Sequence, residues 1–373
     1  KRLSDCIGSY GSVSRIGGDE FVLLLEDLRD LRACEGLLSR ILHRMSAKYA
    51  VADYEIAISA SIGVTLFPAD DVAADLLLRH ADQAMYQAKE AGRNRYKVFD
   101  LAQDKQTQAY QLMLARLEMA LDANEFISYY QPKVNMRTGE VLGAESLIRW
   151  NHPQQGLLLP YAFLPKVEHT DFMINLGDWV LNEALQQLKV WKENDFVTKI
   201  SVNVSSQHLQ QENFVNNLKK LLKKYHTIDP SQLELEILET TALSDLNRAS
   251  DIINKCRSLG VTVAIDDFGT GYSSLIYLKR LPADILKIDQ SFVRGMITDV
   301  EDRAIVNGII ELSHAVGREI IAEGVETEKH GSMLLKLGCD LGQGYGIARP
   351  MPAEKFPVWA NNYEQLPVWS QTN

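Results

Sequence analysis

The chain of 373 residues is poor in cysteine and has no long hydrophobic run. Its cysteines form no Cys-x-x-Cys pair and have no ladder of histidines beside them, so we expect neither disulfides nor a zinc site from Cys6, Cys34, Cys256 and Cys339. No apolar run approaches the roughly 20 residues that a membrane helix needs, and no signal peptide precedes the first expected strand. We therefore expect a cytoplasmic segment that makes no membrane contact. Because it begins with Lys1, we expect a piece of a longer protein whose upstream part can carry sensor or inner-membrane regions.

Basic residues are fewer than acidic residues. The chain has 39 Lys and Arg against 49 Asp and Glu, which gives a formal net charge of -10. This balance argues against a protein that coats large nucleic acids, because it offers no extended basic surface to release phosphate counterions. A small anionic substrate remains compatible if cations screen its charge locally. The length and the 46% hydrophobic content allow two globular domains, one of them as large as an α/β barrel.

The first hundred residues have the pattern of a small α+β domain. Residues 12–26 alternate between apolar and polar around Gly17-Gly18, a pair that suits a tight hairpin turn because both of its positions need positive φ. The next expected elements are a helix over 31–45, a strand over 54–66, a helix that ends near Gly92, and a strand over 96–99. In the second of these helices, four apolar residues share a face: Leu77, Ala81, Ala84 and Ala88.

A long helix and a repeating pattern follow. Residues 102–123 contain no Gly or Pro, and their apolar residues recur at steps of three and four, which predicts a connecting helix. Beyond it, short apolar runs alternate with helical periods over about 250 residues, the size of a (β/α)₈ barrel. The expected strands cover residues 127–134, 141–149, 199–204, 233–238, 261–265, 285–288, 320–322 and 345–348. The expected fold class is therefore α/β, a TIM-type (β/α)₈ barrel preceded by a partial α+β domain.

Acidic or amide side chains stand where several of these strands end. A carboxylate left unpaired at the end of a buried strand is costly, so each of them needs a counter-charge. In a barrel of parallel strands, the carboxyl ends open on one face, where these side chains would converge. Oxygen ligands in such number favour divalent cations, most plausibly Mg²⁺ or Mn²⁺. The residues are Glu145, Asn203, Glu236, Asp266, Asp267 and Glu323.

Each of these residues also has a simpler interpretation. The alternatives are a turn with a helix N-cap at Asp266-Asp267, a structural ion pair of Lys287 with Asp289, and a solvated edge at Glu236 and Glu239. Taken one at a time, each of these interpretations explains its residues as well as a metal site does. Taken together, they require acids to gather at the ends of the strands by coincidence, which favours a shared metal site.

Two motifs in the first domain resemble the back half of a GGDEF (diguanylate cyclase) domain. They are Arg15-Ile16-Gly17-Gly18-Asp19-Glu20-Phe21 and the later Ala81-Asp82-Gln83-Ala84-Met85-Tyr86-Gln87-Ala88-Lys89 with Gly92-Arg93-Asn94. The resemblance implies that Asp19 and Glu20 lie beside a metal and the attacking hydroxyl, and that Lys89 and Arg93 meet a triphosphate. The tetrapeptide GGDE alone would favour an ordinary exposed hairpin with acids for solubility, and the downstream motif reverses that preference as regards ancestry.

The chain lacks parts of that family's pattern. The first half of the domain, which carries another metal-binding aspartate and the groups that read guanine, does not precede Lys1. We therefore expect no cyclase activity from this chain. The family's inhibitory Arg-x-x-Asp site would fall at residues 8–11, which hold neither charge, so we expect no feedback inhibition there.

Across residues 117–352 the chain resembles an EAL-type cyclic-di-GMP phosphodiesterase. The motifs occur in the family's order: Glu145-Ser146-Leu147 with Arg149-Trp150, Asn203-Val204-Ser205, Glu236-Ile237-Leu238-Glu239, Asp266-Asp267-Phe268-Gly269-Thr270-Gly271, Lys287-Ile288-Asp289, Glu323-Gly324-Val325-Glu326 and Gln343-Gly344-Tyr345. The resemblance implies metal-dependent hydrolysis of cyclic-di-GMP to linear 5′-pGpG in bacterial signalling. It divides the chain into a partial GGDEF domain (1–100), a connecting helix (101–122) and an EAL domain (123–373).

The resemblance also implies two cation sites, for Mg²⁺ or Mn²⁺. One is held by Glu145, Asn203, Glu236 and Asp266, and the other by Asp266, Asp267 and Glu323. The one departure from the family's pattern is Ser146 in place of alanine. A side chain one step from Glu145 on a strand points to the opposite face, so we expect a mild effect at most.

Further residues have implied roles around the reacting groups. Lys287 would approach the nucleophilic water, and Asp289 and Gln343 would lie near that water or the substrate. Glu239 would hold the loop 268–271 in place. The expected substrate contacts are Arg149 to a phosphate oxygen and Gln131 to a guanosine, with Leu147, Asp289 and Glu326 also at the substrate.

Two other functions stay open at this point. The chain could be a catalytically inactive receptor that binds cyclic-di-GMP and passes the signal to a partner, although inactive relatives tend to have lost metal carboxylates or the Asp-Asp-Phe-Gly loop that this chain keeps. A diguanylate cyclase would need the missing upstream half. EAL relatives often pair through helices near that loop, here after Gly271, so we expect a homodimer through the EAL domain.

Overall fold

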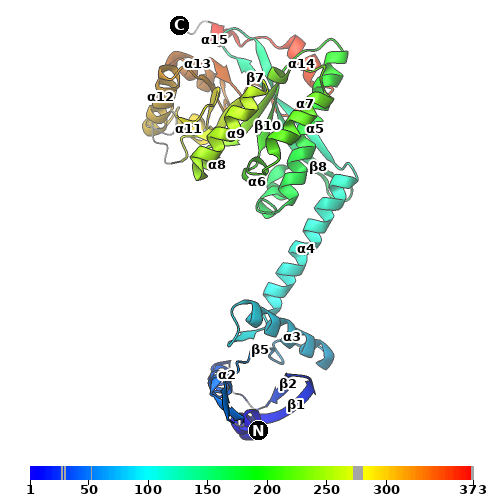
Figure 1. Cartoon of the computed structure of the whole chain (residues 1–373). Helices are drawn as coiled ribbons and strands as arrows, with labels where there is room; N and C mark the ends of the chain where they lie inside the picture. Colours follow the sequence, from blue (N-terminus) through cyan, green and yellow to red (C-terminus); the bar gives the residue numbers. More distant parts are fainter. Residues whose placement is uncertain (27, 29–30, 52, 272–279, 371–373) are drawn as a thin grey trace. The chain divides into compact units, whose positions relative to one another are not determined.

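The computed structural model describes residues 1–373 except 27, 29–30, 52, 272–279 and 371–373 (Figure 1). The chain forms two compact units, Lys1–Leu112 and Met113–Asn373. The division falls inside helix α4 (Leu101–Asp122), which confirms the long helix expected over 102–123.

The first unit is an α+β arrangement built from small, separate sheets. Its elements are α1 (Arg2–Ile7), η1 (Gly8–Tyr10), β1 (Gly11–Gly17), β2 (Glu20–Leu25), α2 (Leu31–Ser46), β3 (Tyr49–Val51), β4 (Tyr54–Ile56), β5 (Ile62–Val64), α3 (Ala74–Glu90) and β6 (Tyr96–Val98). Strands β1 and β2 form the expected hairpin, in which Gly17 faces Glu20. Of the two glycines only Gly18 has a positive φ, of 51°, because the turn lies one residue further along the chain than expected. Ala84 and Ala88 of α3 are fully buried, as the helix pattern predicted.

The prediction of a single strand over 54–66 is wrong. The segment contains two strands that belong to different sheets, since β4 pairs antiparallel with β3 and β5 pairs parallel with β6. The chain must leave the first sheet before it enters the second. At Gly63 of β5, a Cβ atom would lie 1.8 Å from the Ala81 carbonyl oxygen of α3, so this strand fits only with glycine at that position.

The second unit is a closed barrel of eight strands among the described residues, which confirms the predicted TIM-type fold. The strands are β7 (Phe126–Asn135), β8 (Val141–His152), β10 (Ile200–Val204), β11 (Leu233–Leu238), β12 (Thr262–Phe268), β13 (Ile285–Ile288), β14 (Glu319–Ala322) and β15 (Leu341–Gly342). Neighbours pair in this order, and β7 closes the ring by pairing with both β8 and β15. Two short strands extend the sheet, β9 (Gly156–Leu158) on β8 and β16 (Met351–Pro352) on β7.

Two details of the expected barrel are wrong. Strand β7 runs antiparallel to both of its barrel neighbours, because residues 136–140 form only a hairpin loop and a parallel crossover needs a dozen residues or more. The eighth strand is Leu341–Gly342, whereas residues 345–347 form a turn. A Cβ at Gly344 would lie 2.3 Å from the Val325 backbone nitrogen, so this segment packs directly against the loop after β14.

Helices surround the barrel and bury the outer faces of its strands (Figure 1). They are α5 (Phe172–Glu193), α6 (Ser206–Leu209), α7 (Phe214–Lys224), α8 (Glu239–Ser244), α9 (Leu246–Ser258), α11 (Gln290–Gly295), α12 (Val300–Ala315), α13 (Glu328–Leu337), α14 (Phe356–Asn362) and α15 (Pro367–Ser370), with 3-10 turns η2 (Pro160–Ala162), η3 (Leu164–Lys166) and η4 (Pro230–Gln232). The main core lies between these helices and the sheet. The carboxyl ends of the seven parallel strands lie at one end of the barrel.

Candidate active site

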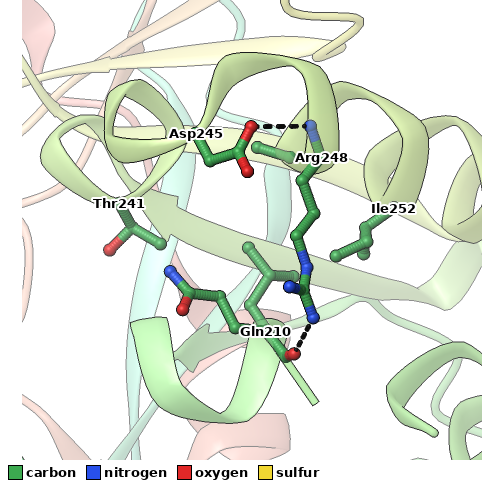
Figure 2. Close-up of a pocket in the computed structure, with 7 residues that line it drawn as sticks. Gln210, Thr241, Asp245, Arg248 and Ile252 are labelled. Atoms are coloured by element: carbon green, nitrogen blue, oxygen red, sulfur yellow. Dashed lines mark hydrogen bonds between the residues drawn. The ribbon is translucent and has the colours of Figure 1, made fainter. Parts of the chain in front are cut away.

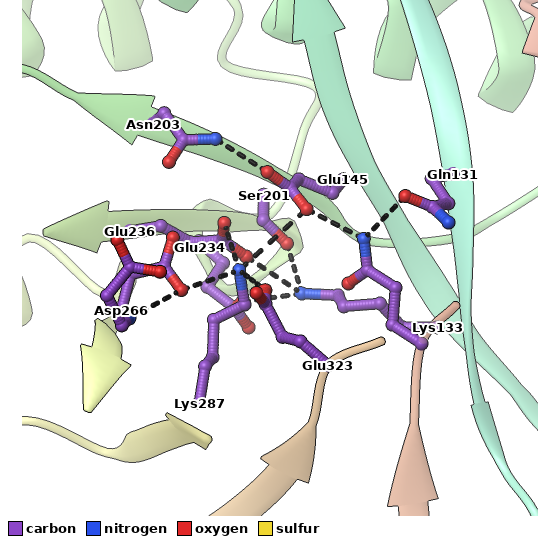
Figure 3. A network of polar contacts seen from close by, with 12 residues as sticks. Gln131, Lys133, Glu145, Ser201, Asn203, Glu234, Glu236, Asp266, Lys287 and Glu323 are labelled. Carbon is purple, nitrogen blue, oxygen red and sulfur yellow. Dashed lines mark hydrogen bonds and ion pairs between the residues drawn. The ribbon is translucent and has the colours of Figure 1, made fainter. Parts of the chain in front are cut away.

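A fully buried lysine lies at the centre of the acidic side chains of the barrel (Figure 3). Lys287 leaves β13, and its Nζ is 2.6 Å from Glu236 Oε2 and 2.5 Å from Glu323 Oε1. The same Nζ is 3.2 Å from Asp266 Oδ1 and 3.8 Å from Glu145 Oε2. Four carboxylates predicted from the sequence therefore converge on one ammonium group, although Glu145 and Glu236 lie within β8 and β11 and not at the ends of these strands.

Amide side chains orient the carboxylate of Glu145. Asn203 Nδ2 on β10 donates to Glu145 Oε1 at 2.6 Å, and Gln343 Nε2 donates to Glu145 Oε2 at 2.7 Å. Gln343 Nε2 also donates to Gln131 Oε1 at 3.2 Å, and Gln131 in turn donates to the Ala348 carbonyl at 3.1 Å. The structure thus brings Gln131, Asn203 and Gln343 into one group with the acids.

The adjacent residues Asp266 and Asp267 both contribute to the site because the strand distorts where they lie. The pairing of β12 with β13 changes register between Ile265 and Phe268, and Asp267 has a φ of 54°. Its backbone N–H donates to Asp266 Oδ1 at 3.0 Å. Carboxylate oxygens of Asp266, Asp267 and Glu323 all lie within 4.8 Å of one another, in the described part of the chain. Three such hard oxygen donors suit Mg²⁺ or Mn²⁺.

Glu239 holds the loop that follows these aspartates. It is the first residue of α8 and is almost fully buried, and its Oε2 accepts from the backbone N–H of Gly269 at 3.0 Å and of Gly271 at 3.3 Å. The side chain therefore contacts the loop 268–271, where the resemblance to the EAL family had placed it.

The charges in the site shift the pKa values of its carboxyl groups in opposite directions. Burial, together with repulsion from Glu236, raises the pKa of Glu145 to about 7. Burial and the neighbouring carboxylate of Asp266 raise the pKa of Asp267 to about 6. Burial opposes ionisation of Glu236 as well, but the ammonium groups of Lys287 and Lys133 outweigh it and hold the pKa of Glu236 at about 2. Without a cation, the site therefore favours protons on some of its acids.

Other residues assigned to the site lie further from its centre. Asp289 caps α11, where its Oδ1 accepts from the Ser291 backbone at 3.0 Å, and its carboxyl also contacts Asp267. Arg149 is buried and donates to the Ile148 carbonyl at 2.9 Å, and Leu147 beside it is half-buried.

Two residues of the motifs do not join the cluster. Glu326 forms an exposed ion pair of 2.8 Å with Arg294 of α11. Ser146 is buried on the face of β8 opposite to Glu145, and its hydroxyl has no hydrogen-bond partner among the described residues. The structure thus places Ser146 outside the group of possible ligands.

Sequence reasoning missed three polar residues beneath the acids: Lys133, Ser201 and Glu234. Lys133 of β7 donates to Ser201 Oγ and, at 2.5 Å, to Glu234 Oε1. A signal was present, because Lys133 follows Gln131 by two positions and Glu234 precedes Glu236 by two. Residues two apart on a strand share a face.

A further cavity lies on the outside of the barrel, away from the acids (Figure 2). It is lined by α6, α8 and α9, with Arg248 donating to the Gln210 carbonyl at 2.5 Å. Its volume of about 10 Å³ holds no more than one water molecule. The acidic cluster at the barrel mouth is therefore the stronger candidate for chemistry.

Comparison with known families agrees with this geometry. Residues 114–350 match the family model described as "EAL domain". The chain belongs to the EAL-domain family. Residues 1–95 match the model described as "Diguanylate cyclase, GGDEF domain", so the EAL domain follows part of a second family.

Individual relatives show the same relationship. The chain is 40% identical over 357 residues to the bifunctional diguanylate cyclase/cyclic di-GMP phosphodiesterase MucR of Pseudomonas aeruginosa, covering 95% of this chain and 52% of MucR. It is 34% identical over 361 residues to the cyclic di-GMP phosphodiesterase PdeR of Escherichia coli, covering 97% and 54%. The chain thus spans about half the length of these relatives.

A solved structure described as "PaMucR Phosphodiesterase, c-di-GMP complex" is also similar to the EAL domain. It is 42% identical, covers 66% of this chain and 99% of its own, and superimposes with a TM-score of 0.63. Among the described residues, no helix combines the length and the apolar character needed to cross a membrane.

Proposed function

We propose that the EAL domain hydrolyses cyclic-di-GMP to linear 5′-pGpG with the help of divalent cations. The observation that carries this proposal is the convergence of Glu145, Glu236, Asp266 and Glu323 on Lys287 at the mouth of the barrel. Supporting it, the similar proteins MucR and PdeR are named cyclic di-GMP phosphodiesterases, and the similar solved structure is described as a c-di-GMP complex.

The residues present fit a pair of Mg²⁺ or Mn²⁺ ions. Glu145, Asn203, Glu236 and Asp266 would hold one ion, and Asp266, Asp267 and Glu323 the other. The donor set supports this, since three of these carboxylates already have oxygens within 4.8 Å of one another and all the donors are hard oxygens. When bound, the ions supply positive charge that lowers the pKa of water and stabilises the phosphoryl oxygens in the transition state.

The chain's own residues orient the reacting groups. Lys287 brings a fixed positive charge to the centre of the site, where its ammonium would donate a hydrogen bond to the attacking oxygen and favour its deprotonated form. Gln343 holds the carboxylate of Glu145 through its Nε2 at 2.7 Å. Glu239 keeps the loop after Asp267 in position through its two backbone contacts.

Substrate recognition would fall to residues around the mouth. Arg149 would bind a phosphate oxygen, and Gln131 would contact a guanosine. Asp289, Leu147 and Glu326 complete the proposed set of contacts. For Glu326 to reach the substrate, its ion pair with Arg294 must open, which an exposed pair does at little cost.

Chromatography of the reaction products tests this function. The wild-type chain, incubated with cyclic-di-GMP and Mg²⁺, is expected to form the linear dinucleotide, and Glu145→Gln is expected to abolish this reaction. Glu140→Gln serves as the matched control, because Glu140 is an exposed carboxylate in the loop just before the same strand. Binding of cyclic-di-GMP without hydrolysis by the wild type would instead establish a receptor.

We also propose that the chain acts in the cytoplasm as a homodimer that pairs through the EAL domain. The segment expected to form the interface, after Gly271, lies outside the described residues. Light scattering of the purified chain tests the proposal, since a monomer at micromolar concentration would contradict it.

A further inference from the structure

The floor of the barrel, one layer beneath the acids, has two different halves. On one side it is apolar, where Ala264, Ile285 and Ile321 form a small buried cluster and the partly buried Leu341 packs against it. On the other side it is polar and charged, and consists of Lys133, Ser201 and Glu234. All three polar side chains are almost fully buried. Barrels of this type usually fill such layers with branched apolar side chains.

Lys133 links this polar floor to the site above it (Figure 3). Its Nζ donates to Glu234 Oε1 at 2.5 Å and lies 3.5 Å from Glu236 Oε1. The other oxygen of Glu236, Oε2, pairs with Lys287 at 2.6 Å. Glu236 therefore lies between two ammonium groups. Its Oε1 is buried and lies 3.5 Å from the ammonium of Lys133, so the charge of Lys133 orients that oxygen.

A buried ion pair of this kind is not explained by stability alone. Taking two charges out of water costs several kcal/mol, and replacing such a pair with apolar residues of similar volume is often neutral or stabilising. The apolar half of the same floor shows that the barrel accommodates that solution. The buried charges of Lys133 and Glu234 are therefore better explained by a function in the acidic site above them than by packing of the barrel floor.

We propose that Lys133 is a positioning residue that fixes the carboxylate of Glu236 for cation binding, while Glu234 keeps Lys133 from closing onto Glu236. Glu234 accepts the shorter contact and holds the ammonium in the floor, at a distance where it orients Glu236 Oε1 without occupying it. This inference rests on the proposed metal-dependent function, because it assigns Lys133 a role toward one of the proposed metal ligands.

The test is the affinity for Mn²⁺ in the absence of substrate, measured by titration calorimetry together with the thermal unfolding midpoint. The double variant Lys133→Met with Glu234→Gln removes both charges of the pair at nearly constant volume, so it leaves no unpaired buried carboxylate in the floor. We expect it to unfold near the wild-type temperature and to bind Mn²⁺ about tenfold more weakly, as changes next to metal ligands typically do. A role confined to stability would leave the Mn²⁺ affinity of this variant unchanged.

One single variant completes the comparison. Glu234→Gln leaves Lys133 without its carboxylate partner and free to close onto Glu236 Oε1, so we expect this variant to bind Mn²⁺ more weakly than the double variant. Equal weakening in Glu234→Gln and in the double variant, or wild-type affinity in the double variant, would overturn the role of Lys133. A wild-type chain that binds no Mn²⁺ would instead contradict the proposed function itself, so the two failures are distinguishable.

Discussion

Lys287 and Glu236 form an ion pair of 2.6 Å in which neither side chain is exposed to solvent. The carboxylates around Lys287 outweigh the effect of burial and raise the pKa of Lys287 well above its usual value, so the ammonium is charged at neutral pH. One positive charge nevertheless faces four carboxyl groups. This excess of acid is the physical reason to expect divalent cations at the barrel mouth.

Replacing Lys287 with methionine should destabilise the protein strongly when no divalent cation is present. The change leaves buried carboxylates without their counter-charge, a loss of about 3–5 kcal/mol in the free energy of unfolding. Saturating Mn²⁺ should recover part of that stability, because ligands that bind only the folded state stabilise it. Lys287→Met should not hydrolyse cyclic-di-GMP, even when Mn²⁺ has restored part of its stability.

Denaturant unfolding in EDTA and in Mn²⁺ measures this effect. Lys255→Met is the matched control, since Lys255 forms an exposed pair with Asp251 that is worth at most about 1 kcal/mol. If Lys287→Met were as stable as the wild type in EDTA, the ion-pair cluster would not have the role described.

Replacing Glu239 with alanine should weaken cation binding although Glu239 is not a proposed ligand. The change removes the acceptor of the Gly269 and Gly271 N–H groups, so the loop next to Asp267 loses its anchor. We expect Mn²⁺ affinity to fall by roughly 10–100-fold, as for other residues that orient metal ligands. Calorimetry measures this, with the exposed Glu212→Ala as control. Unchanged affinity in Glu239→Ala would show that the loop positions itself without this carboxylate.

The stability of the cation-free protein should depend on pH through the raised pKa values of its acids. Glu145 and Asp267 have pKa values of about 7 and about 6 in the folded protein, above the ordinary values of 4.5 and 3.8. The folded state therefore binds more protons than the unfolded state between pH 4 and 7, and these groups lower the free energy of unfolding as pH rises through that range. Divalent cations favour the ionised forms of Glu145 and Asp267, so they should oppose this loss of stability at higher pH.

The free energy of unfolding at pH 5.5 and at pH 7.5, with Mg²⁺ and with EDTA, measures this dependence. The increase in the free energy of unfolding on adding Mg²⁺ should be larger at pH 7.5 than at pH 5.5. Because the values with Mg²⁺ and with EDTA are compared at the same pH, titration of groups outside the site cancels. A stabilisation that is equal at both pH values would contradict the assignment of raised pKa values to the site.

Much of this site could be predicted from residue pattern because it depends on where strands end. Asp266 and Asp267 follow a short apolar run, and the closure of the barrel brings them next to Glu323, as the acids at strand ends had suggested. The barrel itself followed from the alternation of short apolar runs with helical periods. The antiparallel direction of β7 could also have been predicted from the sequence, because the loop over 136–140 is too short for a parallel crossover.

Other features depend on contacts that no local pattern contains. The spacing of two from Gln131 places Lys133 on the inner face of its strand, but only the closed barrel places it between Glu234 and Glu236. The eighth strand was misplaced because the run Tyr345-Gly346-Ile347-Ala348 looks extended. The close approach of Gly344 to the Val325 backbone makes it a turn instead.

Replacing Ser146 with alanine should be neutral or stabilising. The Ser146 hydroxyl is buried without a partner in the described structure, a situation that costs about 1–3 kcal/mol. Thermal unfolding and the hydrolysis rate should both stay at or above wild-type values. Ser201→Ala is the contrasting control, because Ser201 accepts from Lys133 and its loss should destabilise the chain. Loss of hydrolysis in Ser146→Ala would place this hydroxyl in the chemistry after all.

Electron paramagnetic resonance of free Mn²⁺ measures how many of these ions the wild-type chain binds. We expect two ions per chain at pH 7.5, as at other two-metal phosphodiester sites. Asp267→Asn should lose one of them, since Asp267 is assigned to a single ion. A wild-type chain that leaves all the added Mn²⁺ free would contradict the account.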